Sequence, residues 1–198
     1  MAAELPTDPR IIRRERERAV LLDMAKMRWR DGEPLDISSL AVAGGQSRAT
    51  AYRWFGDNDQ LLAEVLRSRT DDLFETARKR HAGEEGAPRI IGVLRDYIQH
   101  VAASSRFKEL LDRDPQRVMT IVASGAFPNQ MHVISLVQTL VEEELDSGTI
   151  AVSGDAYTVA CAMARISEAF LYAGVLAGEQ VDLDAAIATI RPLLLSRE

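Results

Sequence analysis

The feature that most constrains the fold is DISSLAVAGGQSRATAYRWF, at residues 36–55. It divides into two short helical halves at the pair Gly44 and Gly45, which can form a tight turn. Asp36 is a candidate N-cap for the first half, and Ser47 is one for the second half, 48–55. In the first half, apolar residues recur at helical spacing: Ile37, Leu40 and Ala41.

Two helices this short cannot bury a core alone, and their spacing matches the helix-turn-helix, whose second helix enters the DNA major groove. The residues at the start of that helix reach base edges, and later ones reach phosphates. Tyr52, Trp54 and Phe55 are also compatible with packing inside a three-helix head. The predicted base-reading residues are Gln46, Ser47, Arg48 and Thr50, and the predicted phosphate contacts are Tyr52, Arg53 and Trp54.

A helical pattern precedes this stretch, from Arg10 to Arg30. Its first turns, IIRRERER, favour either a solvated helix start with ion pairs four residues apart or a basic arm on phosphates. Arg13 and Arg14 are the candidate phosphate contacts in the second interpretation. Its apolar face is expected to consist of Val20, Leu21, Met24 and either Met27 or Arg28, which recur at helical spacing, with Trp29 at its end.

Charge is distributed unevenly along the chain. The net charge is −6, but residues 1–55 have an excess of basic residues whereas residues 56–198 are strongly acidic. This asymmetry favours DNA binding by the first part and keeps the rest away from DNA.

Several function classes lack support in the residues. The single cysteine excludes an internal disulfide, and three scattered histidines leave no metal-ligand spacing. We expect no catalytic residues, no cofactor and no metal, because neither a Gly-rich phosphate loop nor a Ser/His/Asp constellation is visible; the run Glu142–Glu144 is expected to be a solvated face. No apolar run is long enough to span a membrane, and the N-terminus has no secretory pattern, so a cytoplasmic setting without a membrane partner is expected.

The whole chain is predicted to be all-α, with no lasting strand pattern. An N-terminal three-helix head binds DNA, and a C-terminal helical body binds a ligand and dimerises. The predicted organisation is a flexible tail at 1–9, a helix-turn-helix domain at 10–56, a connecting helix at 57–80 and an effector-binding and dimerisation domain at 81–198. Body helices are expected at 89–103, 107–111, 115–123, 130–145, 155–177 and 183–195.

The longest body helix has a narrow polar strip. Either this strip is solvent-facing, with an Arg165–Glu168 ion pair, or it is the wall of a mostly apolar effector pocket. The strip consists of Thr158, Cys161, Arg165, Glu168 and Tyr172. Further candidate ligand contacts, each equally compatible with ordinary core packing, are Tyr97, His100, Phe107, Met119, Val122, Phe127, Met131 and His132.

The stretch GGQSRATAYRWFGDNDQLLAEVL resembles the signature of TetR-family transcriptional regulators over about residues 15–66. RRERERAVLLDMAKMRWRDG, with the turn at Gln46–Thr50, also resembles the QsdR branch, which is associated with lactone-degrading pathways. Asp36 and Asn58 depart from the family pattern, which often has Thr and Lys there near phosphates. The resemblance implies a homodimer through the last two helices; the apolar residues expected there or in the adjoining core are Val159, Met163, Ile166, Phe170, Ile187 and Ile190.

The function predicted from the sequence is a repressor that a small amphipathic effector, with lactones as the class to test first, releases from operator DNA. The alternative is a DNA-binding activator or architectural protein without a small ligand. An enzyme is not supported.

Overall fold

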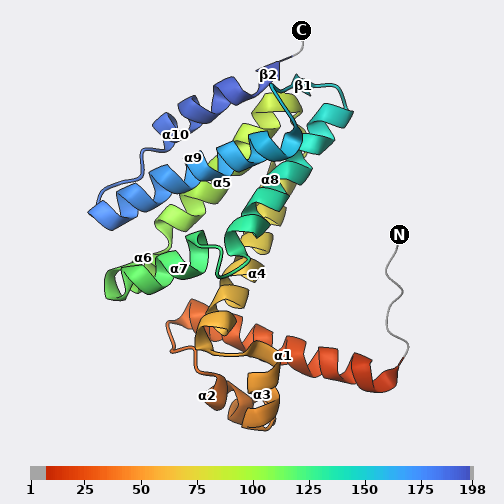
Figure 1. Ribbon diagram of the computed structural model, residues 1–198, viewed down its shortest axis with the longest axis vertical. Helices are drawn as coiled ribbons and strands as arrows, with labels where there is room; N and C mark the ends of the chain where they lie inside the picture. Colours follow the sequence, from red (N-terminus) through yellow and green to blue (C-terminus); the bar gives the residue numbers. More distant parts are fainter. Residues whose placement is uncertain (1–7, 197–198) are drawn as a thin grey trace. The chain divides into compact units, whose positions relative to one another are not determined.

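The computed structural model describes residues 8–196, apart from the side chains of residues 175, 195 and 196. Within that range the chain is almost entirely helical, as predicted (Figure 1). The elements are α1 (Pro9–Asp31), α2 (Ile37–Ala43), α3 (Arg48–Phe55), α4 (Asn58–Arg80), α5 (Gly86–Ala103), α6 (Ser105–Arg113), α7 (Pro115–Ala123), α8 (Asn129–Asp146), β1 (Ile150–Ala151), α9 (Ala156–Ala177), α10 (Leu183–Ile190), the 3-10 turn η1 (Arg191–Leu193) and β2 (Leu195–Ser196).

The chain divides into two compact units, residues 1–66 and 67–198. The division falls inside α4, so this helix contributes to both units, whereas the sequence pattern placed the boundary after residue 80. Residues 1–7 of the predicted tail lie outside the described range, and α1 already begins at Pro9, with Asp8 as its N-cap.

Local sequence signals account for where the helices of the first unit begin and end. The Asp36 side chain accepts a hydrogen bond from the Ser39 amide at 2.7 Å and so caps α2. A reciprocal capping box opens α4: the Asp57 carboxylate accepts from the Gln60 amide at 2.8 Å, and the Asp57 amide donates to Gln60 Oε1 at 3.2 Å. Gly44 suits the α2–α3 turn because an added Cβ would lie 2.3 Å from Cδ2 of buried Leu21 on α1, which would then have to shift.

The buried face of α1 differs from the prediction. Leu21 and Trp29 are buried together with Ala25, but Val20 and Met27 are 55% and 54% exposed. The three buried residues are four apart and so form one stripe along the helix. The apolar pattern therefore predicted a wider buried stripe than the structure has. It also left out Ala25, because alanine is only weakly hydrophobic, although its small side chain fits where two helices approach closely.

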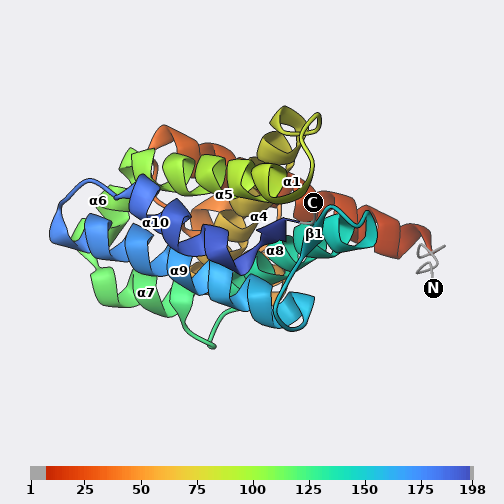
Figure 2. The same cartoon turned by 90° about the horizontal axis from the view of Figure 1, so that it is seen from above.

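The second unit is a bundle in which α8 and α9 pack along each other and α10 lies beside α9 and α5 (Figure 2). Its core contains side chains from α4, α5, α8, α9 and α10. Among them are Phe74, Ile90, Leu94, Val137, Leu140, Val159, Met163, Ile187 and Ile190. The predicted interface residues Val159, Met163, Ile187 and Ile190 therefore lie in the adjoining core.

The prediction of a last helix at 183–195 is wrong at its C-terminal end. α10 stops at Ile190, a 3-10 turn follows, and β2 then pairs antiparallel with β1, with Ile150 opposite Ser196 and Ala151 opposite Leu195. Strands of two residues are too short to leave an alternating pattern in the sequence, so this pairing could not be predicted.

The expectation of a solvated face at 142–144 holds for exposed Glu142 but is wrong for Glu144. Glu144 is 3% exposed, and its carboxylate accepts hydrogen bonds from the Gly86 amide at 2.5 Å and the Thr149 hydroxyl at 2.7 Å. Arg89 completes the set with an ion pair to the same carboxylate. The buried charge is thus fully partnered and ties α8 to the start of α5.

Candidate nucleic-acid interface and effector site

The start of α3 is fixed by its own hydroxyl groups. Ser47 Oγ accepts a hydrogen bond from the Thr50 amide at 3.1 Å and lies 2.9 Å from Thr50 Oγ1. Both predicted base-reading hydroxyls therefore have a local partner. Gln46 lies in the turn and is partly exposed. Its backbone amide donates a hydrogen bond to the Ala41 carbonyl at 2.8 Å.

The remainder of α3 has one inward and one outward face. Ala51 and Phe55 are buried, and Arg48, Tyr52 and Arg53 are exposed. Neither arginine makes an ion pair within the described part of the chain. The outward face therefore combines two unpaired guanidinium groups with a phenol, which suits DNA phosphates and guanine edges. Ala49 is exposed on the same face.

Trp54 is partly buried, and its indole Nε1 is fully covered without an acceptor among the described residues. A contact from this N–H to phosphate requires the side chain to move. The contact to DNA therefore stays a prediction, and packing inside the head is its observed environment.

Both candidate arginines of the basic arm are exposed on the first turns of α1. Arg13 Nε donates to Glu17 at 2.8 Å, and this hydrogen bond raises the pKa of the Arg13 side chain. Arg14 has no ion pair within residues 8–196. The two interpretations of the arm thus apply to different residues: Arg13 forms a surface pair, and Arg14 remains available for phosphate.

Asp36 and Asn58, the two departures from the family pattern, act together. Asn58 Oδ1 accepts from the Ile37 amide at 3.0 Å, so it holds the first turn of α2 to the start of α4. The hydrogen bond from the Ser39 amide is the main reason why the pKa of Asp36 lies below its ordinary value, and Asn58 adds to it. These side chains organise the head internally.

Arg18 joins three helices of the head, a role that no sequence signal indicated. One terminal nitrogen of Arg18 donates to both carboxylate oxygens of Glu64 on α4, at 2.6 and 2.7 Å. The guanidinium carbon also lies 5.0 Å from the centre of the Phe55 ring on α3. The reading helix is therefore connected to α1 and α4 through a partly buried ion pair and a cation–π contact.

Four of the predicted effector contacts come together in the second unit: Tyr97, Phe107, Glu168 and Tyr172. The rings of Phe107 and Tyr172 lie 6.4 Å apart. Burial raises the pKa of Glu168, although a hydrogen bond from Gln130 opposes it. Burial raises the pKa of Tyr97 to about 12 and that of Tyr172 well above its ordinary value, and the charge of Glu168 adds to both shifts.

Three residues of this cluster were missed by the sequence prediction. Buried Gln130 donates from Nε2 to Glu168 Oε2 at 2.7 Å. Phe74 lies 4.8 Å from Tyr97, ring to ring, and Thr70 hydrogen-bonds to the Tyr97 hydroxyl. Phe74 and Thr70 belong to α4, whose apolar pattern predicts only a connecting helix, so their proximity to Tyr97 could not be predicted.

The polar strip on α9 is divided between the two interpretations. Thr158 and Arg165 are exposed, whereas Cys161, Glu168 and Tyr172 are partly buried. Glu168 bonds to Gln130 instead of forming the predicted ion pair with Arg165. Cys161, Glu168 and Tyr172 are therefore turned partly towards the bundle, whereas Thr158 and Arg165 face solvent.

The other candidate contacts are not drawn into this cluster by any described interaction. His100 is exposed and bonds to the Asp96 carbonyl at 2.8 Å, and Met131 is 52% exposed. His132 lies 2.5 Å from an oxygen of Asp71. The remaining candidates are buried Val122 and the partly buried Met119 and Phe127.

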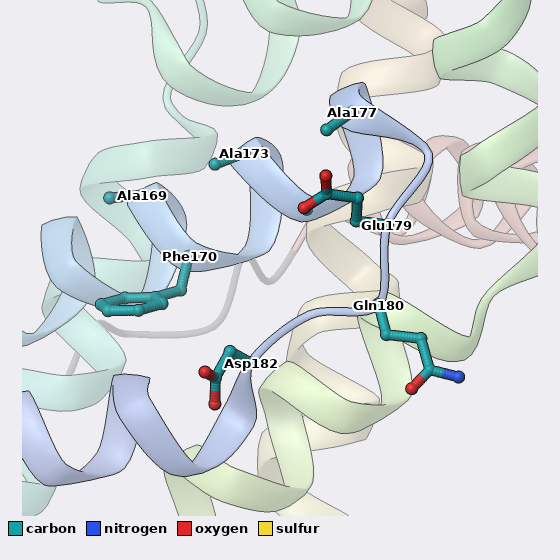
Figure 3. Close-up of a pocket in the computed structure, with 8 residues that line it drawn as sticks. Ala169, Phe170, Ala173, Ala177, Glu179, Gln180 and Asp182 are labelled. Atoms are coloured by element: carbon teal, nitrogen blue, oxygen red, sulfur yellow. The ribbon is translucent and has the colours of Figure 1, made fainter.

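An open groove of about 450 Å³ runs between α9 and the start of α10 (Figure 3). Its wall on α9 consists mainly of small residues, and Phe170 closes one side. Three acidic or amide side chains, Glu179, Gln180 and Asp182, line the loop side. The small α9 residues are Ala169, Ala173, Gly174 and Ala177.

Among the described residues, no helix is long and apolar enough to cross a membrane. The same part of the chain contains no group of His, Cys, Asp and Glu side chains arranged to hold a metal ion.

The chain was compared with known families and structures. Residues 85–195 match the family "Tetracyclin repressor-like, C-terminal domain". The transcriptional repressor QsdR of R. erythropolis, from the TetR family, is 28% identical, with a TM-score of 0.82 over 93% of this chain and 97% of that chain.

Two more distant structures share the fold alone. Reduced NemR of E. coli is 13% identical, with a TM-score of 0.56 over 92% of this chain and 100% of its own. The fatty acid degradation regulator FadR of Bacillus halodurans is also 13% identical, with a TM-score of 0.55 over 87% of this chain and 95% of its own.

No curated protein matches the chain. The family match covers more than half of the chain. Members of this family are transcription regulators that bind DNA and dimerise, and they are not enzymes. The chain therefore belongs to the TetR family of transcription regulators.

Proposed function

We propose that this protein is a repressor that binds operator DNA through α3 and leaves it when a small amphipathic effector binds the second unit. The outward face of α3 supports this proposal most directly, because Arg48, Tyr52 and Arg53 are exposed on a helix anchored by buried Phe55. Repression, as opposed to activation, is inferred from the similarity to QsdR, which is described as a transcriptional repressor.

The predicted contacts have different roles in this proposal. Arg48 reads a base edge, whereas Tyr52, Arg53 and Arg14 neutralise or bond phosphates. Ser47 and Thr50 are engaged with each other, so their main contribution is to fix the start of α3.

A homodimer is the proposed DNA-binding form, with α9 and α10 as its interface. In support, α9 exposes small residues at Ala169 and Ala173, which permit close approach of a second helix. In such a dimer two reading helices lie about 34–36 Å apart, one turn of DNA. An effector then acts by binding better to a form in which this spacing is lost.

The proposed effector site is the cluster of Tyr97, Phe107, Glu168 and Tyr172. Aromatic rings with a few polar groups are the usual lining of a site for an amphipathic molecule. Lactones remain the first class to test, because of the resemblance to the QsdR branch.

Selection of operator sequences from random duplex DNA by the purified protein tests the DNA-binding proposal. We expect a two-fold symmetric site, with half-sites about one helical turn apart. Absence of any sequence enrichment would contradict the proposal. Titration of effectors into the protein–operator complex, followed by gel shift, tests release. If DNA binding is specific but no compound releases it, the alternative of a regulator without a small ligand is favoured.

A further inference from the structure

A second cavity, of about 380 Å³, lies at the end of the bundle where α9 connects to α10 (Figure 2). Its walls come from the C-terminal end of α5, from the start of α6, and from the connection between α9 and α10 together with the first residue of α10. None of its lining residues belongs to the proposed effector cluster. The cavity is therefore a separate candidate site for a small molecule.

The connection that forms one wall of this cavity is held at several points. The Glu179 amide donates to the Gly174 carbonyl at 2.9 Å, which ends α9. Val181 packs so closely on α9 that a Cβ added to Gly174 would lie 3.2 Å from the Val181 Cα. The Asp182 carboxylate then accepts from the Ala185 amide at 2.9 Å and caps α10. The wall is therefore formed before any ligand arrives, so binding does not have to order it.

The lining combines an apolar floor with polar side chains that have no partners. Ile98 is fully buried, and the other apolar floor residues, Ala102, Val181 and Leu183, are partly buried. The polar lining residues are all exposed and are Gln99, Lys108, Glu179 and Gln180. None of these four side chains has a hydrogen-bond or ion-pair partner within the part of the chain that the structure describes.

Lys108 and Glu179 bring opposite charges to this one cavity without pairing with each other. A neighbouring pair of charges on α6 is already satisfied, because Arg106 forms an ion pair with Glu109. An anion in the cavity is repelled by Glu179, and a cation is repelled by Lys108. A molecule that carries both charges is attracted to both residues.

We propose that this cavity binds a small zwitterion whose ammonium group meets Glu179 and whose carboxylate meets Lys108, with an apolar body on the buried floor. An apolar α-amino acid of the size of leucine has this chemistry. The side-chain amides of Gln99 and Gln180 can donate to the carboxylate and accept from the ammonium group. The site goes beyond the proposed function, since neither DNA binding nor the effector cluster requires it.

Titration of the full chain with L-leucine, followed by proton–nitrogen correlation NMR, tests both the affinity and the place of binding. We expect the amide signals of residues 98–103 and 179–183 to shift. N-acetyl-L-leucine lacks the ammonium group and L-leucinamide lacks the carboxylate, so each is expected to bind about 5-fold more weakly than leucine. Absence of leucine binding, equal binding of either analogue, or shifts centred on Gln130 and Glu168 would overturn the proposal.

Exchange of the two charges separates their role in binding from any role in packing. Lys108→Glu and Glu179→Lys are each expected to lower leucine affinity about 5-fold, because one half of the ligand then meets a like charge. The double variant restores one charge of each sign and is expected to regain most of the affinity. Glu142→Lys, on an exposed site of α8 outside the cavity, is the matched control and should leave leucine affinity unchanged. Additive losses in the double variant contradict the proposal.

A variant that fills the cavity tests the site without changing any charge. Ala103 lines the cavity and is exposed at the end of α5, so Ala103→Trp can occupy the space without disturbing the core. We expect leucine affinity to fall at least about 10-fold while the circular dichroism spectrum stays that of the parent protein. Unchanged leucine affinity in Ala103→Trp would place the ligand elsewhere and refute the site.

Discussion

Asp36 and Asn58 explain how single residues change the character of this head. At these positions the family often has side chains near phosphates, but here one caps α2 and the other holds the first turn of α2. The Ile37 and Ser39 amides are thereby occupied inside the protein. We therefore propose that more of the salt-dependent DNA affinity comes from Arg14 and Arg53, while Tyr52 adds a neutral hydrogen bond to phosphate.

Arg48 and Arg53 are expected to differ in what their loss does to DNA binding. Arg48→Ala should cost roughly 1–3 kcal/mol and relax the preference at one base pair, because a base-edge contact discriminates between bases. Arg53→Ala should weaken binding to all sequences and lower the salt slope by about 1. Binding of the two variants to single-base operator mutants at several salt concentrations measures both effects. A uniform loss with Arg48→Ala would make Arg48 a phosphate contact.

Glu144 shows what a local sequence pattern cannot reveal. Its position in a run of three glutamates predicts solvent, whereas its partners Gly86 and Arg89 lie far away in the sequence. Burial raises the pKa of Glu144, but the hydrogen bonds from Thr149, Gly86 and Arg89 outweigh it and keep the pKa below its ordinary value of 4.5. Its ionised form is therefore favoured by folding.

Glu144→Gln is expected to lower the free energy of unfolding of the second unit by about 2–3 kcal/mol at pH 7, since it leaves Arg89 without one partner. The contribution of Glu144 is fully present above pH 4.5 and is lost as the pH falls through the lower folded-state pKa. Urea unfolding followed by circular dichroism at pH 7 and at pH 3 measures the difference. Glu142→Gln should stay within about 0.5 kcal/mol of the parent protein.

At the scale of elements, the caps were the most informative part of the sequence. Asp36 and Ser47 each accept the hydrogen bond that the pattern predicts, and the Asp57–Gln60 box is complete. These signals are local, because a cap needs only a side chain and amides two or three residues away. The effector cluster depends instead on the packing of five helices, which a local pattern does not reveal. Helical periodicity therefore identified four of its members but not Thr70, Phe74 or Gln130.

The connection of α1 to α4 and α3 through Arg18 predicts measurable coupling. A double-mutant cycle of Arg18→Ala and Glu64→Ala should give a coupling energy on the order of 1 kcal/mol, because the pair is only partly screened by solvent. Both tryptophans of the chain, Trp29 and Trp54, lie in the first unit, so tryptophan fluorescence during urea unfolding reports on the head. Strictly additive losses would show that the ion pair contributes nothing to stability.

At the scale of the whole molecule, charge is distributed unevenly: residues 1–55 have a small basic excess, whereas residues 56–198 are acidic. The excess of arginine near the head and the acidic remainder were visible in the sequence, as were the all-helical class and the family resemblance. The division within α4 was not visible, because a continuous helix gives no break in its pattern.

The proposed dimer can be tested on the groove face of α9. Ala173→Glu places a charge among small exposed residues, so we expect monomers and a large loss of affinity for a two-fold symmetric operator. Analytical ultracentrifugation and gel shift measure the two effects. Ala126→Glu, at an exposed turn, is the matched control and should leave the dimer intact. A stable Ala173→Glu dimer would place the interface elsewhere.

The short pairing of β1 with β2 has a mechanical consequence. It joins the segment after α10 to the segment before α9 by backbone pairing, so the two ends of the α9–α10 hairpin are held together. Its opposite end is the connection at 178–182, where Gly178 takes a left-handed conformation. The α9–α10 hairpin is therefore held by the strand pair at one end and by the connection at 178–182 at the other. We expect its motions to be larger near the connection than near the strand pair.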